Sequence, residues 1–351
     1  MSGLRLRALS GLDAKAPACF VVEAGGTRLM LDLGRVGAAA PDLRRAGPVN
    51  AVLLSHQHPD HAGALDGLDR LGQPPIHATE AVAAALGIAA RPLPLRGRTC
   101  FGGVVVTTGL AGHAPGAIWL HLAAEGDTLL YCGDVEPTGA AYPFEPPPMA
   151  ETVVIDASYG LDLTPPDARA RIVERVLTAE GPALLPAPAS GRGLEMALAL
   201  HEAGRAPALC TASRAKAQEA RRRPDVLRPQ ARATLAALLD VEAPDPGLAL
   251  VDDPTLSGAP AREAAERALR AGGLVLFTGD PPAGSPAAAL VREGRAEVAR
   301  WPAHPDLAAN AALLRRVGAR RVLPAFCAPA VGDALVGRLG LERAVLAEPT
   351  S

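Results

Sequence analysis

The sequence predicts an α/β protein in which one domain is interrupted by another. The first third of the chain consists of short apolar stretches separated by glycine-rich and polar turns, a pattern typical of strands. From about residue 163, apolar strands alternate with stretches of helical periodicity, which favours parallel α/β units. Short elements return from about residue 290. We therefore expect a first domain segment over residues 1–163, an inserted domain over 164–290 and a closing segment over 291–351.

The individual elements follow from apolar runs, turn residues and periodicity. The strands expected in the first segment are Leu4–Leu9, Cys19–Glu23, Arg28–Leu33, Ala51–Ser55, Val104–Thr108, Ile118–Leu122, Thr128–Cys132 and Val153–Asp156. The pair Gly25-Gly26 predicts a hairpin, and an amphipathic stretch runs from Asp60 to Leu71. The later elements expected are the strands Ala183–Pro186, Gly273–Thr278 and Arg321–Leu323 and the helices 193–203 and Gly332–Leu339.

Composition indicates a well-packed globular protein. Of the 351 residues, 49% are hydrophobic and 21% are charged, which suffices for a large core. The 35 Lys and Arg residues are balanced by 37 Asp and Glu residues, so the formal net charge is −2. This balance excludes a histone-like protein held on nucleic acid by bulk charge, although it leaves room for a local basic groove.

The spacing of the cysteines and the lack of long apolar runs indicate in which cellular compartment the protein is expected. The five cysteines are widely scattered and form no C-x-x-C pair, which indicates neither a zinc ribbon nor a disulfide framework. The N-terminal sequence lacks the apolar core of a signal peptide, and no apolar run approaches the ~20 residues of a membrane-spanning helix. We therefore expect a cytoplasmic protein without a membrane partner.

The strongest chemical pattern is the heptapeptide SHQHPDH, which begins at Ser55 directly after an apolar strand. In an extended segment, side chains two residues apart project to the same side, so His56 and His58 can converge on one point. The following proline keeps the chain extended there, and a helix that begins near Asp60 turns Asp60 and His61 toward a second point. Because imidazole and carboxylate groups suit zinc, the loop predicts ligands for two metal ions.

This H-x-H-x-D-H motif resembles that of the metallo-β-lactamase superfamily, and three further segments resemble the family in the expected order. Leu29–Gly34 (LMLDLG) is similar to an early strand that ends in Asp-x-Gly. The segment AGHAPG resembles the one that supplies a further metal histidine, here His113. The segment YCGD resembles the strand end whose aspartate bridges both metals, here Asp134. The resemblance implies a four-layer αβ/βα sandwich.

The later motifs resemble the β-CASP branch of that superfamily, which contains nucleases of RNA 3′-end processing, RNase J and DNA crosslink repair. Thr152–Gly160 resembles a strand ending in an acidic residue, here Asp156, and WPAHPD resembles a motif that carries a histidine, here His304. Leu184–Leu200 and Leu276–Ala288 resemble segments of the branch's inserted domain. The resemblance implies that residues 164–290 form an inserted α/β β-CASP domain.

The sequence departs from the family at its last metal-ligand motif. The family has a further histidine about twenty residues after the position of His304, whereas this chain has no later histidine. Counting without gaps places Phe326 there, and Phe cannot ligate a metal. The neighbouring Cys327 can bind zinc as a thiolate, or it is a buried structural cysteine. We therefore expect a second metal site that is weaker than the first.

The resemblance also implies a role for each site residue. The first zinc ion is expected to be held by His56, His58, His113 and Asp134, and the second by Asp60, His61 and Asp134. Asp60 orients or deprotonates the attacking water. His304 protonates the leaving oxygen, and Asp156 fixes the tautomer of His304.

Two further features suggest contacts to a substrate. Ser190, Gly191 and Arg192 lie between an expected strand and helix, where backbone N–H groups and a guanidinium can hold a phosphate. Residues 214–232 contain many cations and few acids, so they either line a nucleic-acid groove or form a solvated helix face. Aromatic residues make up only 3% of the chain, which does not support a stacking platform for single strands.

Together these features predict a zinc-dependent phosphodiester hydrolase, a nuclease for which RNA is favoured over DNA. Two alternatives stay open: a metallo-hydrolase of a small ester, lactone or thioester, and a catalytically weakened RNA-binding homologue. The sequence leaves open an exonuclease or an endonuclease, and a monomer or a homodimer.

Overall fold

The computed structural model describes residues 3–14 and 16–347. Residues 1, 2, 15 and 348–351, which the expected first and closing segments include, lie outside the described residues. The chain divides into two compact units. The first contains the residues up to Thr138, Pro143–Leu163 and the residues from His304 onward, and the second contains Gly139–Tyr142 and Thr164–Ala303.

One sheet of the first unit has six strands in sequence order. They are β1 (Arg5–Ser10), β2 (Cys19–Ala24), β3 (Thr27–Leu31), β4 (Ala51–Leu53), β5 (Ile76–Ala78) and β6 (Arg91–Pro92). The first three strands pair antiparallel and the later ones pair in parallel. Gly25 and Gly26 join β2 to β3 with φ angles of 52° and 76°. This left-handed pair forms the tight hairpin turn that the sequence predicts.

The other sheet of the first unit has seven strands in the order β18-β17-β11-β10-β9-β8-β7. They are β7 (Gly97–Phe101), β8 (Val104–Leu110), β9 (Ile118–Ala124), β10 (Asp127–Tyr131), β11 (Thr152–Asp156), β17 (Arg321–Ala325) and β18 (Glu342–Arg343). Strand β11 pairs in parallel with both β10 and β17. The carboxyl ends of these three strands therefore lie at one edge of the sheet. Asp134 follows β10, Asp156 is the last residue of β11, and Phe326 follows β17.

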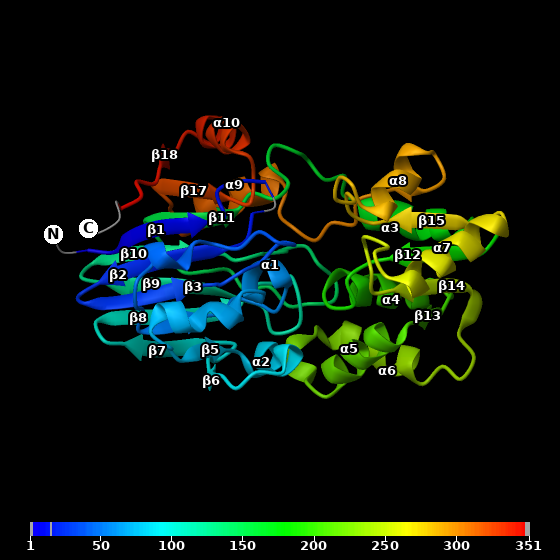
Figure 1. The fold of residues 1–351 in the computed structure, drawn as a ribbon, viewed down its shortest axis with the longest axis horizontal. Helices are drawn as coiled ribbons and strands as arrows, with labels where there is room; N and C mark the ends of the chain where they lie inside the picture. Colours follow the sequence, from blue (N-terminus) through cyan, green and yellow to red (C-terminus); the bar gives the residue numbers. More distant parts are fainter. Residues whose placement is uncertain (1–2, 15, 348–351) are drawn as a thin grey trace. The chain divides into compact units, whose positions relative to one another are not determined.

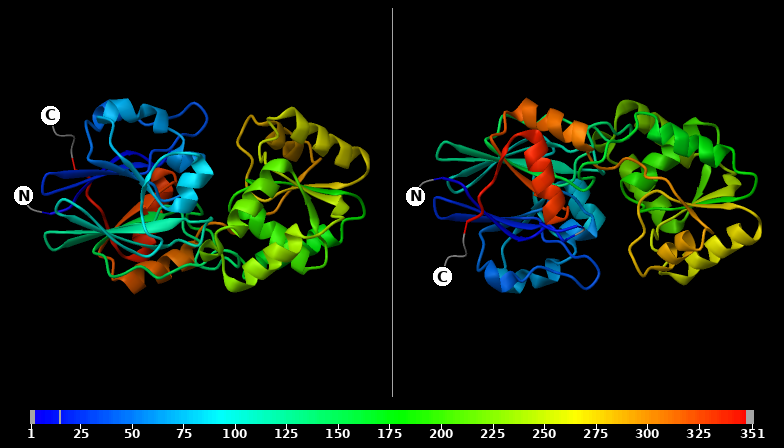
Figure 2. Two further views of the ribbon diagram at one scale, coloured as in Figure 1. Left: turned by 90° about the horizontal axis from the view of Figure 1, so that it is seen from below. Right: turned by 90° about the horizontal axis from the view of Figure 1, so that it is seen from above.

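The two sheets form the inner layers of a four-layer unit. An apolar cluster that includes Phe20 and Leu53 from the first sheet and Leu120 and Tyr131 from the second lies between them. The outer face of the first sheet packs against η1 (Leu43–Arg45), α1 (Pro59–Ala62), η2 (Leu65–Leu71) and α2 (Glu80–Leu86). The outer face of the second packs against α9 (Leu307–Val317) and α10 (Pro329–Leu339). Figures 1 and 2 show these layers, which confirm the αβ/βα sandwich.

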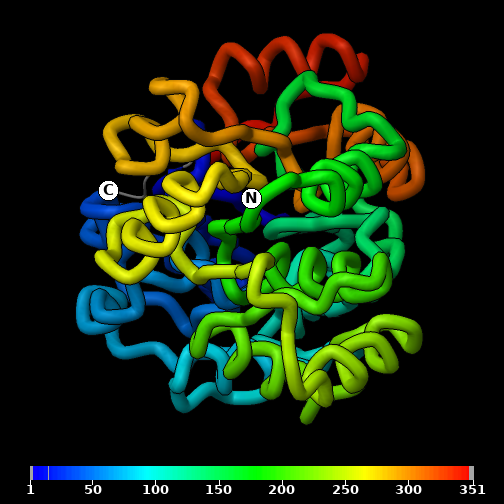
Figure 3. Tube along the Cα trace, turned by 90° about the vertical axis from the view of Figure 1, so that its right-hand side faces the viewer, coloured from blue at the N-terminus to red at the C-terminus, as the bar shows by residue number. Residues whose placement is uncertain are grey.

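The second unit is built on a five-stranded parallel sheet in the order β13-β14-β12-β15-β16. Its strands are β12 (Ala183–Pro186), β13 (Pro207–Leu209), β14 (Asp245–Val251), β15 (Leu274–Phe277) and β16 (Glu297–Val298). The helices, traced in Figure 3, are α3 (Ala168–Leu177), α4 (Arg192–Glu202), α5 (Thr211–Arg221), η3 (Pro224–Val226), α6 (Pro229–Leu239), α7 (Ala259–Arg270) and α8 (Pro286–Arg292). The strand–helix alternation expected for this part of the sequence is present.

The stretch that begins at Asp60 and the boundary after residue 290 differ from the expectation. The stretch from Asp60 to Leu71 is not one helix, because α1 ends after a single turn, where the N–H of Ala64 donates to the carbonyl of Leu33 instead of continuing the helix. The expected boundary between residues 290 and 291 falls inside α8. The second unit continues beyond it to Ala303 because β16 pairs with β15.

None of the helices in the described part of the chain combines the length and apolar character needed to cross a bilayer.

Candidate metal centre

The histidine-rich segment is the connection between β4 and the outer helices. Its backbone is fixed by the segment after β3: the N–H groups of Leu33 and Arg35 donate to the carbonyls of His61 and Pro59. Gly34 is required there, since a Cβ atom would lie 1.7 Å from the carbonyl oxygen of Asp60. His56 and His61 are thereby buried, with 0% and 1% of their surface exposed.

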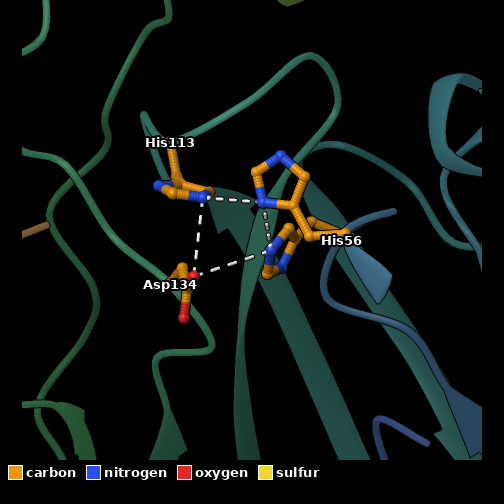
Figure 4. A group of neighbouring side chains, drawn as sticks. His56, His113 and Asp134 are labelled. Atoms are coloured by element: carbon orange, nitrogen blue, oxygen red, sulfur yellow. Dashed lines mark hydrogen bonds and ion pairs between the residues drawn. The ribbon is translucent and has the colours of Figure 1, made fainter. Parts of the chain in front are cut away.

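The first group of site residues contains His56, His58, His113 and Asp134, which offer ligand atoms within 4.8 Å of one another. Nδ1 of His58 lies 3.1 Å from Nε2 of His56 and 3.1 Å from Nε2 of His113. Oδ2 of Asp134 lies 3.7 Å from Nε2 of His56 and 3.5 Å from Nε2 of His113. Figure 4 shows His56, His113 and Asp134 pointing toward one another. The predicted residues are therefore brought together.

These separations fit a tetrahedral metal ion. With zinc–ligand bonds of about 2.0–2.1 Å, adjacent ligand atoms of a tetrahedron lie about 3.3–3.4 Å apart. The four separations given above run from 3.1 to 3.7 Å. Hydrogen bonding alone does not account for this packing, because His58 Nδ1 faces two other ring nitrogens and a neutral imidazole nitrogen accepts or donates only one hydrogen. The group can therefore hold a metal ion.

The second group contains Asp60, His61 and Asp134. Nε2 of His61 lies 3.0 Å from Oδ1 of Asp134 and 4.0 Å from Oδ2 of Asp60. Asp134 thus presents one oxygen to each group, which is the geometry of a bridging carboxylate. The second group offers three ligand atoms, one fewer than a closed tetrahedral site needs.

The residues after β17 do not supply the missing ligand. The ring of Phe326 packs edge-on to the ring of His61, with centroids 5.1 Å apart, at a residue with a left-handed φ of 65°. Cys327 belongs to the apolar cluster beneath α10 and joins none of the metal-binding groups found among the described residues. Burial raises the pKa of its thiol. Cys327 is therefore a buried structural cysteine, the second of the two expectations for it.

Asp32 is a site residue that the sequence reasoning did not select. It is fully buried at a left-handed φ of 58°, so β3 ends before it instead of at Leu33. Its carboxylate accepts hydrogen bonds from the backbone N–H and Oγ–H of Ser55 at 2.7 and 2.6 Å and from the Tyr131 hydroxyl at 2.6 Å. It also lies 2.7 Å from Nδ1 of His61.

This carboxylate determines which ring nitrogens face the metal groups. A proton on His61 Nδ1 is held by Asp32, which leaves Nε2 toward Asp134. The Ser55 hydroxyl donates to Asp32 and lies 3.0 Å from Nδ1 of His56. Its oxygen therefore accepts a hydrogen bond from the Nδ1–H of His56, which leaves Nε2 of His56 to ligate. The only sequence signal for Asp32 was its Asp-x-Gly context.

The surroundings of His56 and His61 shift their pKa values in opposite directions. Burial and the charges of neighbouring histidines hold the pKa of His56 well below its ordinary value, which favours the neutral form that binds metals. Burial also disfavours a charge on His61, but the carboxylates of Asp134 and Asp32 outweigh it and hold the pKa of His61 well above its ordinary value.

Asp156 and His304 form a hydrogen-bonded pair beside Asp134. Nδ1 of His304 lies 2.8 Å from Oδ2 of Asp156 and 3.7 Å from Oδ2 of Asp134. Burial opposes the charge on His304, but these carboxylates outweigh it and raise its pKa to about 9. Burial raises the pKa of Asp156, but the charge and hydrogen bond of His304 outweigh it, so the Asp156 pKa lies below its ordinary value. Ser158 also donates to Asp156 through its backbone and hydroxyl.

Ser190, Gly191 and Arg192 lie in the second unit, where Gly191 precedes the first residue of α4 with a φ of 74°. The Gly191 carbonyl accepts from the Tyr142 hydroxyl at 2.8 Å, and Nη1 of Arg192 donates to the Thr278 carbonyl at 2.9 Å. The guanidinium therefore joins the segments that follow β12 and β15. Their role in substrate binding stays a prediction.

Residues 214–232 form parts of α5 and α6 with η3 between them. Several of the cations have protein partners: Lys216 and Arg223 pair with Glu219, Arg221 pairs with Asp240, and Arg228 donates to the Tyr142 carbonyl. These contacts favour the expectation of a helix face over that of a basic groove.

Comparison with known proteins places this centre in a family. The model of the "Metallo-beta-lactamase superfamily" matches residues 12–187, which are 176 of the 351 residues. The chain is 29% identical over 220 residues to Ribonuclease TTHA0252 of Thermus thermophilus, covering 52% of this chain and 51% of that protein. The chain thus spans about half the length of this curated relative.

A solved structure described as a protein of unknown function from Enterococcus faecalis V583 is 13% identical. It covers 99% of both chains with a TM-score of 0.66, a likeness that shows the fold alone. The family model covers half of the chain, and its range includes the histidine-rich segment, His113 and Asp134. By the match to the family model, the chain belongs to the metallo-β-lactamase superfamily.

Proposed function

We propose that the protein is a zinc-dependent phosphodiester hydrolase that cleaves RNA. The observation that carries the proposal is the convergence of His56, His58, His113 and Asp134, with the His304–Asp156 pair beside it. Metal-dependent hydrolysis is consistent with the superfamily and with the name of the ribonuclease relative. The RNA substrate and the cytoplasmic location are proposals that rest on that relative and on the β-CASP resemblance of residues 164–290.

Zinc is the proposed metal because the donors are imidazoles and carboxylates whose separations of 3.1–3.7 Å fit a tetrahedral ion. His56, His58, His113 and Asp134 would hold the first ion. Asp60, His61 and Asp134 would hold a second one more weakly, since they offer three ligand atoms and the Phe326 ring beside His61 can supply none. When bound, zinc supplies Lewis acidity toward a phosphoryl oxygen and lowers the pKa of water to about 7.

The protein's own groups would manage the protons of the reaction. The Asp60 carboxylate, with 45% of its side-chain surface exposed, is placed to accept a hydrogen bond from the attacking water. The hydrogen bond from His304 Nδ1 to Asp156 leaves the proton on Nε2 for the leaving oxygen. The Asp156 carboxylate stabilises the protonated form of His304 that a general acid requires.

Substrate binding is assigned to Ser190, Gly191 and Arg192. The positive end of the dipole of α4, an eleven-residue helix, would attract a phosphate, and Arg192 adds a positive charge. The N–H of Gly193 would not take part, because it donates to the carbonyl of Pro188 at 3.1 Å.

The test is cleavage of a labelled single-stranded RNA by the zinc-loaded protein, beside the same protein stripped of metal. Cleavage that requires zinc and is lost in Asp60→Ala supports the proposal. If the protein hydrolyses an ester, lactone or thioester and does not cleave RNA, the substrate is a small molecule and the RNA proposal is wrong. Full zinc content without cleavage of any RNA or DNA would instead indicate an RNA-binding homologue without activity, which the sequence leaves open.

A further inference from the structure

The second unit contains a pocket that the proposed hydrolase activity does not use. Its volume of about 630 Å³ lies within the ~300–1,000 Å³ typical of small-molecule sites. Helices α3, α4 and α6 line it, mostly with apolar side chains: Val173, Leu177, Leu198, Ala199 and Ala231. Leu177 is 38% exposed, so an apolar surface is open to a ligand.

A buried carboxylate closes one wall of this pocket. Glu195 is 5% exposed and accepts the backbone N–H of Ala140 at 2.7 Å and the Nε1–H of Trp301 at 3.0 Å. Arg169 lies 3.6 Å from Glu195 and places its guanidinium 6.0 Å from the centre of the Trp301 ring. Arg169 is the only cation among the lining residues, and Glu195 neutralises it.

Two exposed carboxylates, Glu174 and Glu202, lie at the rim. One oxygen of Glu202 accepts from the Thr234 hydroxyl at 2.6 Å. No cation of the lining balances the charges of these two acids. The pocket therefore attracts positive charge and repels phosphate, which sets it apart from any surface that holds an RNA backbone.

We propose that this pocket binds a small organic cation with an apolar body, such as an arylalkyl amine. The apolar body would pack against Leu177, Leu198 and Ala199, and the ammonium group would lie near Glu174 and Glu202. This site is independent of the metal centre and of the proposed nuclease activity.

The experiment compares 4-phenylbutylamine with 4-phenylbutyrate, which share one apolar body and carry opposite charges. The chain has two tryptophans, and only Trp301 lines the pocket. In an ¹⁵N NMR titration of the full chain, the indole signal of Trp301, identified with Trp301→Phe, should shift saturably with the amine. The indole signal of Trp119 in the first unit should stay in place and serves as the internal control for non-specific effects of the amine.

The variants locate the site. Glu174→Gln should weaken amine binding about two- to fivefold, as expected for one exposed ion pair, whereas the exposed Glu242→Gln should not. Ala199→Leu should weaken amine binding by narrowing the pocket, and Ala215→Leu on the exposed face of α5 should leave it unchanged. Backbone amide signals of the second unit that keep the parent's dispersion show that a variant is folded there, and an unchanged Trp119 signal shows the same for the first unit.

Three results would overturn the proposal. The first is a Trp301 signal that does not move with the amine. The second is equal binding of amine and carboxylate, which would show that the rim charges do not select the ligand. The third is a dimer by sedimentation that Ala199→Leu converts to a monomer, which would mean that a second copy of the chain covers the pocket.

Discussion

Replacing Asp32 by Asn should weaken zinc binding although Asp32 is not expected to touch the metal. Oδ2 of Asp32 is the acceptor for the Ser55 hydroxyl, the Tyr131 hydroxyl and the Nδ1 side of His61, and Oδ1 accepts the Ser55 N–H. An Asn can keep its oxygen toward only one of these two sets. With the oxygen toward the three donors, its amide group faces the N–H of Ser55.

The size of the effect follows from these contacts. Hydrogen bonds to a charged acceptor stabilise a protein by about 1 kcal/mol more than neutral ones, and three such bonds are weakened. The N–H of Ser55 would face the amide group of the Asn and lose its acceptor, which costs about 1–3 kcal/mol more. We therefore expect Asp32→Asn to lower the free energy of unfolding by about 4–6 kcal/mol. Since His56 and His61 lose the groups that hold their rings, zinc affinity should fall about 10- to 100-fold.

The assay is zinc competition against a chromophoric chelator, combined with urea unfolding. Asp66→Asn is the matched control, because Asp66 is exposed and pairs only with Arg35 among the described contacts. We expect this control to bind zinc as the parent does. A folded Asp32→Asn protein whose zinc dissociation constant stays within threefold of the parent would refute the role assigned to Asp32.

Three further predictions concern the metal groups and the proton donor. Phe326→His should supply the missing ligand and raise zinc uptake, measured by elemental analysis, from about one toward about two ions per chain. The control Phe144→His should not raise it. If Phe326→His and the parent take up equal amounts of zinc, residue 326 does not face the second group. His304→Gln should slow RNA cleavage by about 100-fold or more with unchanged zinc content, and a rate within threefold of the parent would exclude His304 as the acid. Removing zinc should destabilise the first unit by about 2.7 kcal/mol relative to protein held at a zinc concentration 100 times the dissociation constant. Urea unfolding of the Trp301→Phe chain, followed by the fluorescence of the remaining Trp119, measures this difference, and an unchanged midpoint would mean that zinc does not bind the folded unit.

The parts of the centre that were predictable are local in sequence. His56, His58, Asp60 and His61 lie within six residues, so their convergence follows from the geometry of an extended turn leading into a helix. His113 lies 55 residues from His58, and only the resemblance to a family joined the two before the structure did.

What the sequence did not reveal depends on contacts between distant residues. Asp32 meets Ser55, His61 and Tyr131 at sequence separations of 23, 29 and 99, and no periodicity encodes such a set. The Cys327 side chain packs beneath α10 instead of joining the metal groups, and the spacing of residues in the sequence does not determine this packing.

The helical stretch from Asp60 to Leu71 shows a tertiary contact overriding a local pattern. Its amphipathic spacing is that of a helix. The N–H of Ala64, however, donates to the carbonyl of Leu33, and α1 therefore ends there. Hydrogen bonds from the N–H groups of Leu33 and Arg35 also hold the segment after β3 against the histidine-rich segment. A residue pattern can therefore locate the site while misjudging the element that carries it.

Zinc K-edge X-ray absorption of the full chain with one equivalent of zinc tests the central claim most directly. The account predicts about three imidazole nitrogens and one carboxylate oxygen at about 2.0–2.1 Å, with the imidazole signature reduced in His113→Ala. A sulfur neighbour at about 2.3 Å, or the spectrum of hydrated zinc in solution, would contradict it.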